Sequence, residues 1–173
     1  MKKLFAVIAV ILFLCAFNTG CQQTTAPQEL KKYPIDSMEG MLTLNNVVFD
    51  PAVSSDGRGS VRIDTFSPAT VRLYEMKVDG LEDARVTYRA KLKTKDVEGK
   101  VYLEMWCIFP GGGEYFSRAL ESPLTGTTDW VTQETPFFLK KGQKPELLKL
   151  NVVIEGKGTV WVDDIKIIKG PLK

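Results

Sequence analysis

The sequence predicts an all-β fold in which two antiparallel sheets pack face to face as a β-sandwich. Apolar and polar residues alternate with a period of two in six segments, as expected for strands with one buried face. Glycine-containing turns such as Asp79-Gly80 and Glu98-Gly99 separate these segments, and no segment has the spacing of an amphipathic helix. A single sheet would leave its apolar face in water, so two packed sheets are expected.

Residues 1–20 are typical of a secretory signal peptide. Lys2 and Lys3 form a short basic region, and residues 4–17 form an unbroken apolar run of 14 residues. A membrane-spanning helix needs about 20 apolar residues, so the run is too short to span a bilayer comfortably. A signal peptide accommodates such a run. The polar sequence Asn18-Thr19-Gly20-Cys21 follows the apolar run.

This ending resembles the signal of a bacterial lipoprotein, although Asn18 stands where that pattern prefers Leu or another aliphatic residue. The resemblance implies cleavage after Gly20 and acylation of Cys21, which makes membrane lipid a partner. A plain signal peptide with a chance cysteine and an uncleaved anchor are the alternatives. Gln22 is not the Asp that retains many lipoproteins in the inner membrane. We therefore expect a location in the bacterial cell envelope, on the outer membrane and facing the periplasm.

Composition excludes several kinds of chemistry. The chain has no histidine, which rules out a Ser-His-Asp triad and His-ligated zinc or haem. Loss of residues 1–20 would remove two of the 23 basic residues and leave as many as the 21 acidic ones. A chain without a basic surplus is not expected to bind nucleic acid. Cys107 would then be the one cysteine left without lipid, and it lies in an apolar strand pattern.

Residues 21–32 are polar and are predicted to form a tether, and residues 33–169 are predicted to form the sandwich. In the two longest alternating segments the inward positions include Val86, Tyr88, Leu103 and Met105. The alternation is interrupted at Asp163-Asp164, where a β-bulge is expected. About eight strands are predicted, and the segments that alternate clearly are residues 61–64, 71–74, 85–93, 101–109, 148–155 and 160–163.

Two stretches carry a resemblance to a known superfamily. Residues 124–130 read Leu-Thr-Gly-Thr-Thr-Asp-Trp, and residues 156–167 read Gly-Lys-Gly-Thr-Val-Trp-Val-Asp-Asp-Ile-Lys-Ile. Together they resemble the second half of galactose-binding-like jelly-roll domains, a group that includes many bacterial carbohydrate-binding modules. The resemblance spans residues 85–168 and implies a jelly roll. It specifies function less closely than fold, because one fold serves many functions.

One polar face is a candidate site for a carbohydrate. Aromatic rings stack on the apolar face of a sugar while charged groups hydrogen-bond its hydroxyls. If residues 97–99 form a hairpin, Arg89 would lie beside Glu104 on the outward face. The alternative is a covered sheet face on which Arg89 and Glu104 form a cross-strand ion pair. The candidate ligand-binding residues are Arg89, Tyr102, Glu104, Trp106, Asn151 and Trp161.

The jelly-roll resemblance also implies a structural calcium ion. Related modules often hold Ca²⁺ between an early acidic residue and an Asp of the last strand. In this chain the resemblance implies Asp164 together with Asp36 or Glu39. Carboxylate oxygens are the ligands that Ca²⁺ prefers.

These observations lead to two hypotheses from different classes. The first is a non-catalytic, lipid-anchored envelope protein that binds a carbohydrate or a similar polar ligand. The second is a structural or protein-docking module of a cell-envelope complex, which would carry a flat exposed apolar patch. An enzyme is not expected, because no pair of carboxylates, Gly-x-Ser-x-Gly sequence or phosphate-binding loop stands out.

Overall fold

The computed structural model describes residues 26–172, which form nine strands and no helix. No helix able to span a membrane occurs in this part of the chain. The signal peptide and Cys21 lie outside the described residues. The strands are β1 (Gln28–Tyr33), β2 (Val47–Asp50), β3 (Ser60–Thr65), β4 (Ala69–Lys77), β5 (Ala84–Phe109), β6 (Gly113–Arg118), β7 (Leu124–Leu139), β8 (Leu147–Ile154) and β9 (Lys157–Gly170).

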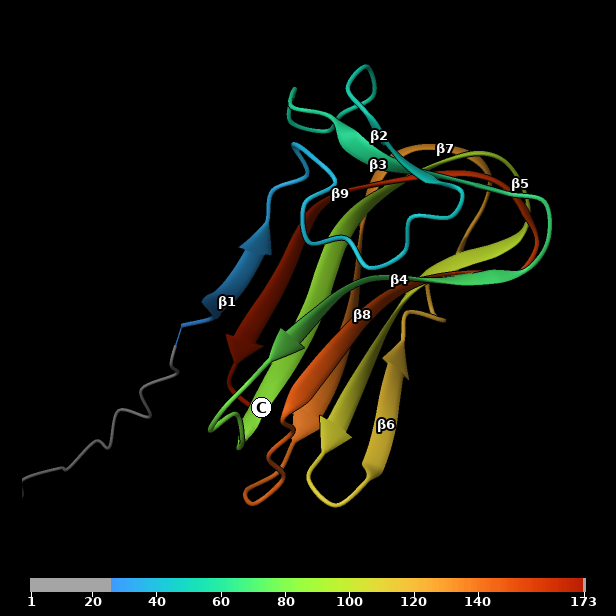
Figure 1. Cartoon of the computed structure of the whole chain (residues 1–173). Coiled ribbons are helices and arrows are strands. Elements are labelled where there is room, and N and C mark those ends of the chain that lie inside the picture. The colour runs from blue at the N-terminus through green and yellow to red at the C-terminus, as the bar shows by residue number, and fades with distance from the viewer. Residues whose placement is uncertain (1–25, 173) are drawn as a thin grey trace, which may run out of the picture.

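The strands form one continuous antiparallel sheet that is folded over into two layers (Figure 1). The first half of β5 lies between β9 and β7, and β9 in turn pairs with β1 and β3. The second half of β5 lies between β8 and β6, and β8 in turn pairs with β4. The predicted all-β sandwich is therefore confirmed, with β5 contributing to both layers.

β5 passes from one layer to the other near residues 96–99. Asp96 and Gly99 have φ angles of 53° and 105°, in a region that L-residues seldom adopt. A Cβ atom on Gly99 would lie 2.3 Å from the carbonyl oxygen of Glu155, so the close approach of the β8–β9 turn requires glycine there. The hairpin predicted at residues 97–99 is wrong, because the two halves of β5 do not pair with each other.

The core lies between the two layers, and the predicted inward residues fill it. Val86, Tyr88, Leu103 and Met105 are fully buried, as is Cys107. Burial raises the pKa of the Cys107 thiol to about 12, so this cysteine is a protonated, small apolar side chain at neutral pH. The sequence alternation thus identifies correctly which face of each half of β5 meets the core.

The predicted β-bulge in the last strand is also present. Arg89 pairs with Lys166, whereas Lys91 pairs with Asp163, so β9 has one extra residue between these pairs. Asp164 has a φ angle of 48°. The extra residue restores the inward direction for Ile165 and the residues that follow it.

The predicted tether is shorter than expected, because its second half forms strand β1. β1 pairs with the end of β9, and the ring of Tyr33 stacks on that of Tyr74 with 4.1 Å between centroids. The sequence of β1 is largely polar because only one side of this edge strand meets the sandwich. A strand of this kind lacks the alternation on which the prediction depended.

Candidate functional site

The outward face of the layer formed by β4, β8, β5 and β6 carries the candidate site. Its side chains lie in rows, because residues in register on neighbouring antiparallel strands point to the same side. One row contains Lys149, Trp106 and Phe116. The neighbouring row crosses all four strands and consists of Arg72 (β4), Asn151 (β8), Glu104 (β5) and Arg118 (β6).

Glu104 is the centre of a hydrogen-bond network on this face. Its Oε1 atom accepts hydrogen bonds from Trp106 Nε1 at 2.7 Å and from Asn151 Nδ2 at 2.8 Å. Its Oε2 atom accepts one from Arg118 Nε at 2.6 Å. Burial by itself raises the pKa of Glu104, but these hydrogen bonds and the Arg118 charge outweigh it and hold the pKa below its usual value. Glu104 is therefore a charged carboxylate that fixes three neighbours.

Aromatic rings border this network. The rings of Trp106 and Phe116 lie 5.0 Å apart between centroids, with an angle of 51° between their planes. The guanidinium carbon of Arg118 lies 4.3 Å from the centroid of Phe116. Trp106 remains partly exposed, and Phe116 is exposed. The face therefore offers ring surface beside fixed polar groups.

The surface is hollowed over the network. A depression of about 310 Å³ is lined by Glu104, Trp106 and Asn151, together with Thr70, Arg72, Glu114, Arg118 and Lys149. A second depression of about 530 Å³ shares Thr70, Arg72 and Asn151 with it and extends toward Leu42 and Glu75. The two depressions share these three lining residues, and we call them together the sheet groove.

Asn151 contributes an unusual atom to the sheet groove. Its side chain is buried, and its Nδ2 atom donates to Glu104. Its Oδ1 atom is buried and accepts no hydrogen bond within the part of the chain that the structure describes. Buried polar atoms are nearly always paired, so an unpaired acceptor beside a groove is a candidate contact for a hydroxyl group.

Four of the six predicted ligand-binding residues lie together on this face: Tyr102, Glu104, Trp106 and Asn151. Tyr102 is only 2 % exposed, and its hydroxyl group donates to Glu155 at 2.8 Å. It therefore supports the groove rather than offering its ring. The sequence did not single out Arg72, Lys149 or Arg118, and residues 113–118 (Gly-Glu-Tyr-Phe-Ser-Arg) have no apolar–polar alternation that would mark Arg118.

The other two predicted ligand-binding residues lie in the opposite layer, so their predicted place on this face is wrong. Arg89 pairs with Lys166 and Glu134 in neighbouring strands and forms an ion pair with Glu134. The expected ion pair between Arg89 and Glu104 is therefore wrong. Trp161 is buried on β9, and its Nε1 atom donates to Asp50 at 2.9 Å. Both errors arise because β5 continues into the second layer instead of turning back on the first.

Asp164, the predicted calcium ligand of the last strand, is paired with lysines. Asp164 lies 3.4 Å from the Nζ atom of Lys32 and accepts a hydrogen bond from Lys166 at 3.0 Å. Asp36 and Glu39 are exposed in the loop after β1. Among residues 26–172, no group of three or more acidic or cysteine side chains is arranged to hold a metal ion. A carboxylate neutralised by two lysines does not fit the role of a calcium ligand.

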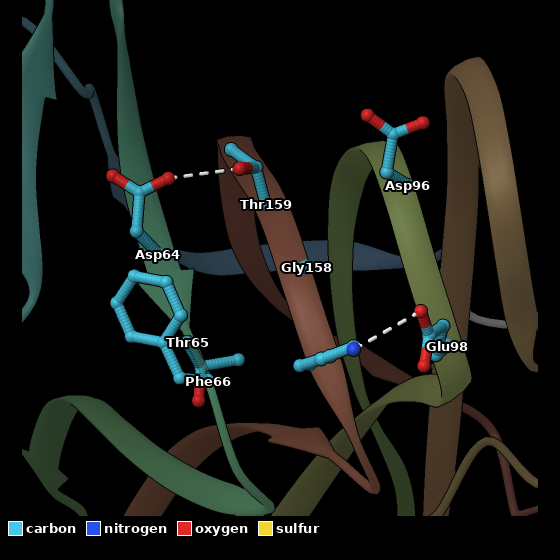
Figure 2. A pocket seen from close by; sticks show the side chains of 8 residues that line it. Asp64, Thr65, Phe66, Asp96, Glu98, Gly158 and Thr159 are labelled. Atoms are coloured by element: carbon cyan, nitrogen blue, oxygen red, sulfur yellow. Dashed lines mark hydrogen bonds and ion pairs between the residues drawn. The ribbon is translucent and has the colours of Figure 1, made fainter.

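A separate pocket of about 540 Å³ lies where the ends of β3 and β9 meet the bend of β5 (Figure 2). Thr159 donates to Asp64 at 2.8 Å, and Lys157 lies 3.2 Å from Glu98. Asp96 and Glu98 are exposed, and the Phe66 ring at its rim is 86 % exposed. Within the described range, none of the carboxylates that line this pocket is buried as Glu104 is in the sheet groove.

No protein-family model matches the sequence, and no curated protein matches it. Solved structures do resemble its fold. The CBM22-1 xylan-binding domain of Paenibacillus barcinonensis Xyn10C is 13 % identical and has a TM-score of 0.62, with 84 % of this chain and 97 % of that domain covered. A family 16 carbohydrate-binding module is 13 % identical with a TM-score of 0.56, covering 76 % of this chain and 92 % of the module.

A third similar structure is a xylan-binding domain from CBM 22, which is 10 % identical with a TM-score of 0.55. The match covers 84 % of this chain and 96 % of that domain. All three are carbohydrate-binding modules with the jelly-roll architecture that the sequence predicts. At these identities the likeness establishes the fold and leaves the function to the site itself.

Proposed function

We propose that this protein binds a carbohydrate in the sheet groove and releases it unchanged. The observation that carries the proposal is the buried Glu104 carboxylate, which holds Trp106, Asn151 and Arg118 in place around the groove. Groups fixed before the ligand arrives lose little conformational entropy on binding. The carbohydrate-binding modules that share the fold support the same conclusion.

The groove has the chemistry that a sugar needs. The partly exposed face of Trp106 suits the apolar C–H surface of a pyranose ring. Arg72 and Lys149 line the groove as hydroxyl-binding donors, and Asn151 Oδ1 is an acceptor without a partner among the described residues. Ligand pockets typically combine ring surface with a few polar groups in this way.

The carboxylates of the groove favour binding over hydrolysis. A glycosidase needs one protonated carboxyl group as a general acid. Glu104 accepts three hydrogen bonds and has a lowered pKa, so it stays ionised at neutral pH. Glu114, the other groove carboxylate on the β6 side, is on an exposed strand and lies 3.4 Å from Lys149. We therefore do not propose that Glu104 and Glu114 act as the acid and base of a glycosidase.

A glycan array tests the proposal, followed by titration calorimetry with soluble polysaccharides. Xylan is a first probe, because two of the similar structures are xylan-binding domains. We expect saturable binding by the chain from residue 22 onward, and binding weakened at least about fivefold in a Trp106→Ala variant that remains folded. Unchanged affinity in Trp106→Ala would place the ligand elsewhere, and no binding to any glycan would overturn the proposal.

We further propose that Cys21 carries lipid and holds the protein in the cell envelope. Gly20-Cys21 after the apolar run supports this assignment. More than one acyl chain makes membrane attachment stable, since each buried CH₂ group contributes about 0.8 kcal/mol. Intact-mass measurement is expected to show an acylated amino terminus at Cys21. Cys21→Ser is expected to abolish membrane fractionation or cleavage, and an unmodified, soluble wild type would refute the assignment.

A further inference from the structure

The start of β1, the β5–β6 loop and the β7–β8 loop lie at the same end of the sandwich (Figure 1). In one layer Gln28, Lys169, Val86 and Phe137 form a row across β1, β9, β5 and β7. In the other layer the corresponding row is Lys77, Leu147, Ile108 and Glu114. The β5–β6 and β7–β8 loops follow directly from these rows. We call this end of the molecule the basal end.

Aromatic side chains gather at the basal end. We call Phe109, Tyr115, Phe137 and Phe138 the basal aromatic cluster; together with Pro110, Gly142 and Gln143 they line a depression of about 430 Å³. The Phe109 and Tyr115 rings meet edge to face at 5.8 Å. Tyr115 is 60 % exposed and Phe138 is 55 % exposed. Exposed aromatic surface of this kind is typical of an interaction site.

Lysines lie beside the basal aromatic cluster. Lys140, Lys141 and Lys144 are exposed in the loop between β7 and β8. Lys144 pairs with Glu82 at 2.9 Å, whereas Lys140 and Lys141 form no ion pair with any residue in the described range. The pocket of Figure 2 lies at the opposite end and contains Asp64, Asp96 and Glu98 with one lysine. Lys140 and Lys141 therefore place unpaired positive charge beside the aromatic cluster, at an end of the sandwich that also carries Glu82 and Glu114.

The chain between Cys21 and β1 limits how far the basal end can lie from a membrane. Six residues separate Cys21 from Gln28, and the fully extended chain from Cys21 to Gln28 spans at most about 25 Å. Phe137 lies three strands from Gln28, which corresponds to about 14 Å. A lipid on Cys21 would thus keep the start of β1, and with it the basal end, within about 25 Å of the bilayer.

From these observations we propose that the basal aromatic cluster, with Lys140 and Lys141, is a second membrane contact. It docks on the phospholipid leaflet that holds the Cys21 lipid, and the inference rests on that proposed lipid anchor. Aromatic rings favour the membrane interface, and lysines favour anionic headgroups. A lipid surface is the preferred occupant because the tether keeps it within reach. Docking would direct the pocket of Figure 2 away from the membrane. The sheet groove would then face to the side.

The test uses the lipidated full-length protein in vesicles of phosphatidylethanolamine and phosphatidylglycerol. Acylation blocks Cys21 and Cys107 is buried, so a cysteine introduced by Phe138→Cys is the one thiol open to an environment-sensitive dye. Phe66→Cys is the matched control, because Phe66 is exposed at the opposite end. We expect a lipid-borne quencher to reduce emission at position 138 at least twofold more than at position 66.

A charge test accompanies the dye test. Lys140→Ser with Lys141→Ser is expected to weaken quenching at position 138, and to do so most clearly at low salt. The control is Lys95→Ser with Lys100→Ser, which removes two exposed lysines near the bend of β5. Equal effects of the two double variants would contradict a role for the basal lysines.

The remaining outcomes separate the two proposals. A wild type that does not float with vesicles overturns the lipid anchor and, with it, the docking. A wild type that floats but shows equal quenching at positions 138 and 66 overturns the docking alone. Concentration-dependent protection of position 138 from aqueous iodide, seen without vesicles, would assign the cluster to a second copy of the chain and also overturn the docking.

Discussion

Asn151 donates a hydrogen bond from Nδ2 to Glu104 Oε1 at 2.8 Å, across a register pair of β8 and β5. Each residue is only 3 % exposed, although both point away from the core between the layers. Outward polar side chains on a sheet are usually solvated, but Trp106 and Arg118 complete the hydrogen bonds of Glu104. The hydrogen-bonded pair is therefore a structural part of the sheet groove, and replacing Glu104 is expected to change the stability of the fold.

Glu104→Gln is expected to change how stability depends on pH. The folded state holds the pKa of Glu104 below its unfolded value of about 4.3, so its contribution is present above pH 4.3. That contribution is lost as the pH falls through the folded pKa. Urea unfolding should show a smaller loss of stability below pH 4 in Glu104→Gln than in the wild type. At pH 7 the variant is expected to be less stable by about 1–3 kcal/mol.

Glu114→Gln is the control for this experiment, because Glu114 is an exposed groove carboxylate that forms its ion pair with Lys149. At pH 7 the stability of Glu114→Gln is expected to differ from that of the wild type by less than about 1 kcal/mol. If wild type and Glu104→Gln lose stability in parallel below pH 4, Glu104 does not provide the acid-sensitive contribution.

Trp106→Ala is expected to weaken saccharide binding by at least about 1 kcal/mol, or roughly fivefold, because the stacking surface is lost. Trp106→Phe retains a ring but removes the Nε1 donor to Glu104, so it should lose less affinity. Leu103→Ala removes a fully buried side chain and should instead destabilise the fold by about 2–5 kcal/mol. Calorimetry and urea unfolding of the three variants separate these effects; a Trp106→Ala variant as unstable as Leu103→Ala would assign Trp106 to the core.

Arg118→Ala and Arg89→Ala form a matched pair of changes in the two layers. Arg118 donates to the buried Glu104 carboxylate, so its loss should destabilise the fold by about 1–3 kcal/mol and reduce saccharide affinity. Arg89 pairs with Glu134 on an exposed face, where an ion pair contributes at most about 1 kcal/mol. Arg89→Ala should therefore leave affinity unchanged. Equal losses of affinity in the two variants would contradict the assignment of the groove to the β4–β8–β5–β6 layer.

Asp163→Ala is expected to destabilise the fold more than Asp164→Ala. The buried Asp163 carboxylate accepts hydrogen bonds from the backbone amides of Ser55 at 2.9 Å and Asp164 at 2.7 Å. Its removal leaves two donors without that partner, at a cost of about 1–3 kcal/mol each if they stay buried. Thermal unfolding measures both variants, and the opposite order would contradict this prediction.

Asp164→Gly is the matched control at the bulge. The φ angle of 48° at Asp164 suits glycine better than alanine, so Asp164→Gly should be more stable than Asp164→Ala by about 1 kcal/mol. Because Asp164 is paired with Lys32 and Lys166, a calcium chelator is expected to leave the thermal midpoint of the wild type unchanged. A midpoint lowered by the chelator would restore the calcium hypothesis.

Several features followed from the sequence because they are local. Alternation with a period of two predicted the inward faces of both halves of β5 and the outward positions of Tyr102, Glu104 and Trp106. The break at Asp163-Asp164 predicted the bulge. Strand β1 escaped prediction, since an edge strand with one contacting side need not alternate clearly.

The partners of each strand were decided by the tertiary structure alone. The sequence by itself determined which side of a strand is apolar, since successive side chains point to opposite faces wherever the strand lies. It did not determine that β5 crosses between layers, which separates Arg89 from Glu104 and Trp161 from Asn151. Nor did it show that Arg118 completes the network around Glu104. Such pairings join segments distant in the chain, and they form because the whole sandwich must bury its apolar faces together.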